Sequence, residues 1–336
     1  MIISAYSKFL SYYAGGAELS TISLLEKQCT NSTKIKIISH KDPKFGGTPL
    51  LPRSFPMQWE NCYIPNLTCF NKFSYYEYLF NRDKLIRWFS DLESNELWAY
   101  GIDAPAAIIG FGGKSKYFIR SESDLGIDSN YYRGSIRFLK SIYTVSQSPA
   151  KNVYYRDLTF AIERSTVITN SKFMASRTKL LFGIDSEVVY PHVDISLHRK
   201  YLNDDRLESN WIVFVGDSEV KGISQVLFAA KKLPYLNFRI FTRFTNYPRI
   251  DGNITWMPWE KDSWRVYSGA RLVIVPSQWE EAYGRVAREA YLLKIPVLVS
   301  NVGGLPEAVD EDQSCLVGDF SNPDEWVKRI CEILSI

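Results

Sequence analysis

Cysteine and histidine are scarce in this chain of 336 residues, which has five of the first and three of the second. The cysteines are odd in number and scattered, without a C-x-x-C pair, so neither a zinc motif nor a disulfide framework is indicated. No apolar run approaches the roughly 18 residues that a membrane span needs. Residues 1–6 read as a strand without a preceding basic region, and not as a signal peptide. These features predict a protein of the reducing cytoplasm.

A strong charge of one sign is also missing, since the formal net charge is +3 at pH 7. Residues 1–190 hold 23 Lys and Arg against 17 Asp and Glu, and residues 191–336 hold 17 against 20. So small an excess does not indicate nucleic acid as a partner, for which clustered basic stripes would be expected. The basic first part is compatible with a peripheral contact on the inner face of an anionic membrane, at roughly 1 kcal/mol per well-placed Lys or Arg. Ordinary solvated surface charge explains it equally well.

Short apolar strands alternate with longer helical patterns along the whole chain, which is typical of α/β domains with parallel sheets. A change of composition after residue 190 predicts two domains, 1–190 and 191–336. In the first domain we expect strands at 2–6, 34–39, 97–102, 106–110, 117–120, 141–145 and 166–169, helices at 17–28, 75–92, 131–140 and 172–181, and an irregular loop at 43–66. In the second we expect strands at 211–215, 238–241, 253–256, 271–275 and 296–300, and helices at 222–232, 260–268 and 323–334.

Residues 276–307 form the most informative segment of the second domain. An apolar strand leads into an acidic loop, a helix after Gly284, a second strand and a Gly-Gly turn. Gly284 leaves the backbone free to approach a ligand, and the amides from Gly284 to Val286 favour an anion such as phosphate at the helix start. Glu281 and Glu289 flank this cradle, so the segment suits a nucleotide sugar. The alternative is an ordinary βαβ unit whose acidic residues suit the helix dipole.

The spacing of Glu281 and Glu289 resembles the E-x7-E signature of retaining glycosyltransferases of family 4. Residues 14–18, which include Gly15 and Gly16, are similar to the family's N-terminal glycine turn, and further similar segments extend to about residue 325. The resemblance implies the GT-B fold, in which two Rossmann-like α/β domains have parallel sheets that face an interdomain cleft. It places the acceptor on 1–190 and the nucleotide-sugar donor on 191–336.

The resemblance also implies roles for single residues. Lys221 is expected to contact the donor diphosphate and to stabilise the charge that grows on the leaving group. Glu281 is expected to contact the transferred sugar, and Glu289 the ribose. An arginine that assists the lysine in many relatives is absent here, so either Arg243 or Arg285 replaces it or the phosphate is held less strongly. The complete expected donor set is Gly15, Gly16, Lys221, Arg243, Glu281, Tyr283, Gly284, Arg285, Val286 and Glu289.

In the first domain, Arg120, Glu122 and Ser123 resemble an Arg-x-Glu-Ser form found in some family members. We expect Arg120 and Glu122 to contact the sugar or the acceptor, with Glu122 in the catalytic set beside Lys221 and Glu281; the alternative is a local ion pair. Residues 310–312 superficially match a D-x-D metal motif but lie in a polar turn. We therefore expect no metal and no cofactor.

These features predict a retaining, metal-independent hexosyltransferase that moves a sugar from a UDP- or GDP-sugar to a glycan or lipid-linked glycan. Retention, and a place in bacterial polysaccharide assembly, follow from the family resemblance alone. One alternative is a nucleotide-sugar-binding protein with little or no turnover, because the assisting arginine is missing. A second is a nucleotide-sugar 2-epimerase on a related scaffold, which would need its own acid and base carboxylates.

Overall fold

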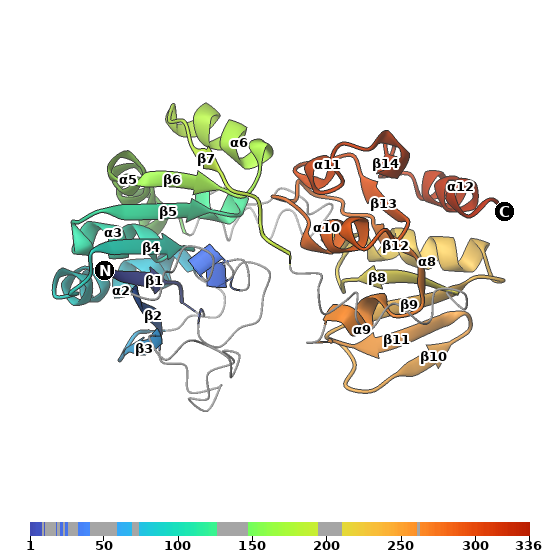
Figure 1. Cartoon of the computed structure of the whole chain (residues 1–336), viewed down its shortest axis with the longest axis horizontal. Coiled ribbons are helices and arrows are strands. Elements are labelled where there is room, and N and C mark those ends of the chain that lie inside the picture. The colour runs from blue at the N-terminus through green and yellow to red at the C-terminus, as the bar shows by residue number, and fades with distance from the viewer. Residues whose placement is uncertain are drawn as a thin grey trace. The chain divides into compact units, whose positions relative to one another are not determined.

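The structure is a computed structural model that describes residues 1–8, 10, 18, 21–22, 24–25, 33–40, 59–68, 74–125, 147–193, 210–260 and 263–336. Internal contacts divide the chain into two units, Met1–His192 and Val193–Ile336. Each unit is an α/β domain built on its own seven-stranded sheet (Figure 1). The boundary between the units falls two residues beyond the expected end of the first domain at residue 190.

The sheet of the first domain has the strand order β3-β2-β1-β4-β5-β6-β7, and all its neighbouring strands are parallel. Its strands are β1 (Ile2–Tyr6), β2 (Lys34–His40), β3 (Trp59–Ile64), β4 (Glu96–Tyr100), β5 (Ser115–Ile119), β6 (Thr166–Thr169) and β7 (Glu187–Val188). Helices α2 (Ser74–Ser90), α3 (Ala104–Phe111) and α5 (Ser148–Arg164) pack against one another, and α6 (Lys172–Phe182) packs beside β6 and β7. Helices cover the sheet, so its central strands are apolar along most of their length, as in β4.

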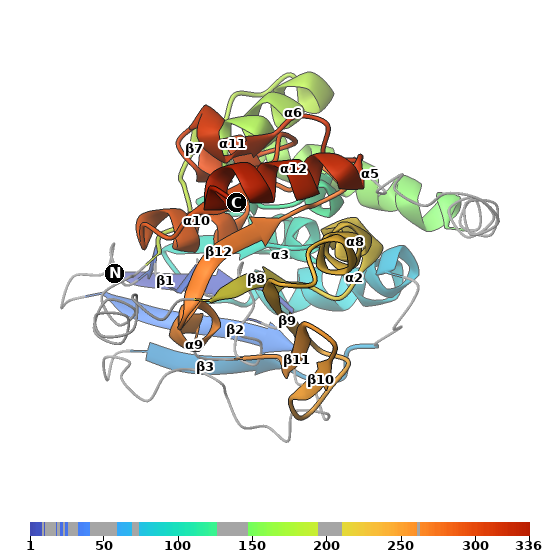
Figure 2. The same ribbon diagram turned by 90° about the vertical axis from the view of Figure 1, so that its right-hand side faces the viewer.

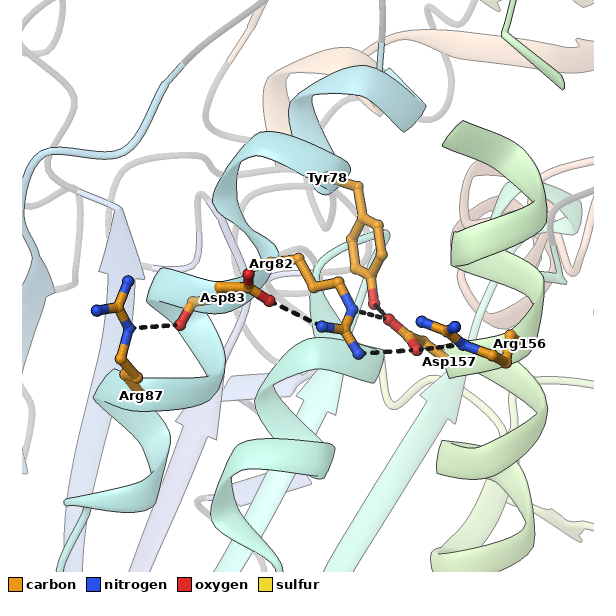
Figure 3. Close-up of polar contacts among 6 residues, drawn as sticks. All are labelled: Tyr78, Arg82, Asp83, Arg87, Arg156 and Asp157. Carbon is orange, nitrogen blue, oxygen red and sulfur yellow. Dashed lines mark hydrogen bonds and ion pairs between the residues drawn. The ribbon is translucent and has the colours of Figure 1, made fainter. Parts of the chain in front are cut away.

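A buried carboxylate joins α2 to α5 (Figure 3). Asp157 of α5 accepts a hydrogen bond from the Tyr78 hydroxyl at 2.8 Å, and Arg82 Nε donates to the same oxygen at 2.5 Å. Arg82 Nη2 donates to the other oxygen of Asp157 at 3.2 Å. Burying a charge is costly unless it is paired and hydrogen-bonded, and these contacts meet that condition. They fix the two helices against each other.

The sheet of the second domain has the order β10-β11-β9-β8-β12-β13-β14, in which only the β10–β11 pair is antiparallel. Its strands are β8 (Trp211–Val215), β9 (Asn237–Thr242), β10 (Arg249–Asp251), β11 (Ile254–Pro258), β12 (Ala270–Val275), β13 (Val297–Ser300) and β14 (Leu316–Val317). Its α-helices are α8 (Ile223–Lys232), α9 (Ser263–Tyr267), α10 (Arg285–Leu292), α11 (Leu305–Ala308) and α12 (Pro323–Leu334).

Alternation along β8 divides the core of the second domain between the two faces of its sheet. Ile212 and Phe214 pack in one cluster with residues of α8 and α12. Val213 packs in another with residues of α9, α10 and α11. In Figure 2, α10 and α8 accordingly lie on opposite sides of β8 and β12.

Two expectations for the first domain are wrong. Residues 106–110, expected as a strand, lie in α3, where Pro105 occupies the first turn and Gly112 ends the helix with a φ of 62°. An apolar run this short does not distinguish strand from helix by periodicity. Residues 59–64, expected as loop, form β3, a partly exposed edge strand. Helix α5 follows the expected alternation of strands and helices, although its bounds were not predicted. The expected elements at 131–140 and 141–145, and most of 17–28, lie outside the described residues.

Two kinds of feature are missing from the described parts of the chain. None of the helices there is both long and apolar enough to span a bilayer. No three His, Cys, Asp or Glu side chains among the same residues are grouped so as to hold a metal ion. Independence from metal nevertheless stays a prediction, which a chelator tests directly.

Candidate functional site

The candidate donor site lies at the carboxyl ends of the parallel strands of the second domain. β8 comes first in the chain, and β9 and β12 lie on either side of it. The chain therefore continues from β8 to one side of the sheet through β9 and later to the other side through β12. Ligands of open α/β sheets bind where the strand order reverses in this way. Lys221 lies in the short 3₁₀ turn after β8, and Glu281 lies in the loop after β12.

Gly222 allows the loops after β8 and β12 to touch. Its φ is +83°, and a Cβ at this position would lie 1.9 Å from the carbonyl oxygen of Pro276. The amide of Gln278 donates to the carbonyl of Val220 across the same junction, at 2.9 Å. Among the twenty residues glycine alone tolerates this backbone and this approach. Lys221, the residue before it, is therefore placed beside the acidic loop.

Lys221 and Glu281 lie in direct contact. Nζ of Lys221 is 2.8 Å from Oε1 of Glu281, and the Ser277 hydroxyl donates to the same oxygen. Nζ also lies 5.5 Å from the ring centroid of Trp279. Burial is the largest influence on Glu281 and opposes its ionisation, but Lys221 and Ser277 outweigh burial and lower the pKa of Glu281. At neutral pH an ionised carboxylate therefore faces the lysine ammonium.

The Gly303-Gly304 turn after β13 packs closely against the backbone of the acidic loop. A Cβ on Gly303 would lie 2.5 Å from the carbonyl oxygen of Glu281, and one on Gly304 would lie 2.3 Å from that of Ala282. The Gly304 amide donates to the Glu281 carbonyl at 2.6 Å. The two glycines thus bring two backbones together, which fixes the position from which the Glu281 side chain extends.

Helix α10 begins directly after this loop, at Gly284. The φ of Gly284 is +101°, and a Cβ there would lie 2.4 Å from a methyl group of Leu305. The N-cap residue, Gly284, has no side chain that could cap the helix start. The first amides of a helix lack partners within it, so those from Gly284 to Val286 can receive an anion.

Glu289 is held from two sides within the second domain. Its side chain is 5% exposed, and Arg285 Nε donates to its Oε1 at 2.6 Å. The buried hydroxyl of Tyr267, on α9, donates to its Oε2 at 2.6 Å. Nη1 of Arg285 is buried without a hydrogen-bond partner among the described residues. Since a guanidinium has five donors in one plane, Arg285 can hold Glu289 and still donate to a ligand oxygen.

The remaining expected donor residues of this domain have different surroundings. Arg243 follows β9, and its guanidinium lies 4.5 Å from the ring centroid of Trp259, which follows β11. Tyr283 is 5% exposed and belongs to the core cluster behind α10. Burial raises the pKa of the Tyr283 phenol to about 12. Tyr283 is therefore placed to support α10, and a donor contact of its hydroxyl stays a prediction.

In the first domain only Arg120 of the four expected site residues can be placed with its side chain. Nη1 of Arg120 donates to the Thr21 hydroxyl at 2.6 Å, and the guanidinium lies 4.9 Å from the Tyr100 ring and 5.0 Å from the Phe118 ring. Burial lowers the pKa of Arg120, against the opposing effects of Tyr100, Asp124 and Glu18. These contacts lie within the first domain, and a contact of Arg120 with the sugar or the acceptor stays a prediction. Gly15, Gly16 and the side chain of Glu122 lie outside the described residues.

A second polar cluster, which sequence reasoning missed, lies at the carboxyl ends of β1, β2 and β4. The Tyr6 hydroxyl is 2.8 Å from His40 Nε2, and that nitrogen is 3.5 Å from Asp103 Oδ2. Lys8 pairs with Glu77 beside them. Burial raises the pKa of Asp103 to about 7 and lowers that of His40 to about 3. Both oxygens of Asp103 are buried and have no hydrogen bond among the described residues.

Sequence reasoning also missed Ser277, Trp279 and Tyr267 in the donor site. Ser277 precedes Glu281 by four residues inside the segment already singled out, so its position could have indicated a contact. Tyr267 precedes Glu289 by 22 residues and lies on a different element. Nothing in the local pattern indicates that pairing.

The acidic turn at 310–312 is occupied by local contacts. Arg288 Nη1 lies 2.8 Å from Asp310 Oδ1. Asp312 accepts hydrogen bonds from the amide and the hydroxyl of Ser314, at 2.9 and 2.7 Å. The carboxylates of Asp310 and Asp312 are thus directed at different protein groups.

Comparison with known proteins bears on this site. A family model described as "Glycosyl transferases group 1" matches residues 249–336, which include Glu281, α10 and Glu289. The D-inositol 3-phosphate glycosyltransferase of Mycolicibacterium smegmatis is 28% identical over 199 residues, which are 51% of this chain and 46% of that protein. The match thus spans less than half the length of this curated relative.

Solved structures resemble the chain over its whole length. Sucrose-phosphate synthase from Thermosynechococcus elongatus has a TM-score of 0.73 at 16% identity, and the match covers 100% of this chain and 90% of that one. HepE of Anabaena in complex with UDP-glucose has a TM-score of 0.69 at 17% identity, covering 99% and 90%. Identities this low concern the fold alone. The chain therefore has the GT-B fold of these proteins, and residues 249–336 match the family model of group 1 glycosyl transferases.

Proposed function

We propose that this protein is a glycosyltransferase that uses a nucleotide-diphosphate sugar. The contact between Lys221 and Glu281 carries this proposal. In this contact a cation and an ionised carboxylate lie together at the carboxyl ends of β8 and β12. Helix α10 starts in the same loop as Glu281, after Gly284. A cation and free amides suit a diphosphate, and a carboxylate that accepts hydrogen bonds suits sugar hydroxyls.

In the proposed reaction, Lys221 leaves Oε1 of Glu281 to contact the donor diphosphate and stabilises the negative charge that develops on it. The amides from Gly284 to Val286 and the guanidinium of Arg285 contact the remaining phosphate oxygens. Glu281 is then free to accept hydrogen bonds from the transferred sugar, and Glu289 accepts them from the ribose. We assign no protein base, because a departing phosphate oxygen can take the proton of the acceptor hydroxyl on the same face.

Because the acceptor attacks on the face from which the phosphate departs, the proposed enzyme retains the anomeric configuration. It needs no metal, because Lys221, Arg285 and the helix amides neutralise the diphosphate. We propose a UDP- or GDP-hexose as donor; HepE was solved with UDP-glucose. The proposed acceptor is a glycan or lipid-linked glycan in polysaccharide assembly, met at the cytoplasmic face of a membrane through the basic first domain. This part rests on the family resemblance and on the charge of residues 1–190.

A protein that binds nucleotide sugars with little turnover is the second candidate, because the site cations already have carboxylate partners and the arginine that assists this lysine in many relatives is missing from the sequence. A thermal-shift screen with UDP, GDP, ADP and their sugars identifies the donor, since a ligand at 100 times its Kd stabilises by about 2.7 kcal/mol. Incubation of that donor with and without a glycan acceptor then separates transfer from binding alone. Conversion of the donor to its epimer would instead favour the 2-epimerase.

A further inference from the structure

We propose that Tyr267 is a positioning residue for the donor ribose. Its hydroxyl fixes one carboxylate oxygen of Glu289 while Arg285 fixes the other, so that Glu289 is presented to two neighbouring hydroxyls in one orientation. This inference rests on the proposed function, because it assumes that Glu289 binds the ribose of a nucleotide.

The geometry of Glu289 carries the inference. A carboxylate has about four lone-pair sites, two on each oxygen. Tyr267 occupies one site on Oε2 and Arg285 one on Oε1, both at 2.6 Å. One site remains on each oxygen, and two adjacent acceptor sites match a pair of vicinal hydroxyls such as the 2′ and 3′ groups of ribose. Because Tyr267 and Arg285 each hold one oxygen, rotation of the carboxylate would break one or both hydrogen bonds, which keeps the two free acceptor sites directed at the hydroxyl pair.

Tyr267 is suited to hold the carboxylate permanently. It is 1% exposed and packs in the core cluster together with Ala287 and Ala290 of α10, the residues on either side of Arg288 and Glu289. Burial, followed by the charge of Glu289, raises the pKa of the Tyr267 phenol well above its ordinary value. The hydroxyl therefore stays protonated and donates throughout the working pH range. Arg285 is 26% exposed, so Tyr267 is the more rigid of the two supports.

The test is Tyr267→Phe, which keeps the ring and removes only the donor. Calorimetry with UDP and 2′-deoxy-UDP, and with the GDP pair if GDP binds better, measures both affinity and preference for ribose. We expect nucleotide affinity to fall about tenfold, the equivalent of one hydrogen bond to a charged group. The preference for ribose over deoxyribose should shrink with it. Donor KM should rise by a similar factor while kcat changes less than about threefold, since ribose binding is uniform between ground and transition states.

Tyr78→Phe is the matched control. Tyr78 is also fully buried and also donates to a buried carboxylate, that of Asp157, at 2.8 Å (Figure 3). It should lower the melting temperature measured by circular dichroism without changing nucleotide affinity. In a Glu289→Gln background, Tyr267→Phe should cause no further loss of affinity, because its partner is already altered.

Three outcomes contradict the inference. Unchanged affinity and ribose preference in Tyr267→Phe would show that Glu289 needs no support. An equal loss in Tyr78→Phe would make the effect a general loss of stability. Full additivity with Glu289→Gln would mean that Tyr267 acts independently of Glu289. A wild-type protein that binds none of UDP, GDP and ADP would overturn the proposed function itself, and the ribose role with it.

Discussion

Lys221 pairs with Glu281, and Arg285 pairs with Glu289, at 2.8 and 2.6 Å. Glu281 and Glu289 are 13% and 5% exposed, so each carboxylate depends on its partner for compensation of its buried charge. Removal of either cation should therefore have two effects: it removes a group that we propose contacts the ligand, and it leaves a carboxylate unpaired. Affinity and stability must both be measured in any variant of this site.

Lys221→Ala should reduce sugar transfer by roughly 10²–10³, because the charge on the leaving diphosphate loses its nearest cation. The melting temperature should also fall, since Glu281 loses its ion pair. Lys231→Ala, at the exposed far end of α8, is the control and should change neither quantity. Steady-state kinetics check this, and activity within threefold of wild type would remove Lys221 from the site.

Asp103 makes stability depend on pH. Because burial raises its pKa to about 7, the folded protein keeps a proton that the unfolded chain releases near pH 4, so the free energy of unfolding falls as pH rises between these values. Asp103→Asn, which imitates the protonated form, should be close to wild type near about pH 3 and exceed it near about pH 8 in urea unfolding. A constant difference at both pH values would show that Asp103 titrates normally.

His40 has the opposite sign. Its pKa is lowered from 6.5 to about 3, so the unfolded chain takes up a proton first as pH falls, and stability is lost between these two values. The two slopes overlap and partly cancel. Because the dependence on Asp103 lies almost wholly within the pH range in which His40 titrates, it should be measured as the difference in stability between wild type and Asp103→Asn.

Strands and helices with a strong local pattern were predicted well. Residues 166–169 and 211–215 form β6 and β8 as expected, and residues 323–334 form α12, because β-branched runs and a proline at a helix start are local signals. Edge elements were not: β3 and the antiparallel β10 depend on pairing with distant strands, which no local pattern encodes.

In the donor site, too, features formed by neighbouring residues could be predicted from the sequence, and contacts between distant residues could not. The acidic loop, Gly284 and the Gly-Gly turn lie within 32 consecutive residues, and the sequence places them together. The contact of Lys221 with Glu281 spans 60 residues, and that of Tyr267 with Glu289 spans 22. A resemblance supplied the first of these partners. The second needs the folded coordinates, since nothing in the sequence indicates that α9 faces α10.

Gly222→Ala tests the junction between the loops after β8 and β12. Gly252→Ala in the β10–β11 turn is the control, because Gly252 also has positive φ, of 59°, but nothing lies within 4 Å of an added Cβ. The control should lose about 1–2 kcal/mol from the left-handed backbone alone. Gly222→Ala should lose more, because the Pro276 carbonyl must move, and it should also lower transfer by displacing Lys221. Equal losses by urea unfolding would contradict a tight junction.

The whole protein should work without a divalent metal, because in the proposed reaction Lys221, Arg285 and helix amides neutralise the diphosphate. Excess EDTA should leave the rate of sugar transfer unchanged. A rate that falls on chelation and returns with manganese would contradict this and would direct attention to the carboxylates of residues 310–312. The control is a metal-dependent glycosyltransferase inhibited under the same conditions.

The paired charges of the donor site have a consequence for ionic strength. Lys221, Glu281, Arg285 and Glu289 together carry no net charge, so the empty site attracts no layer of small anions that a nucleotide would have to displace. Such displacement is what makes binding of phosphates to exposed cations weaken steeply with salt. Nucleotide affinity should therefore change little between about 50 and 200 mM salt. Glu281→Gln would leave one cation unmatched, and its affinity for UDP should rise at low salt and fall as salt is added.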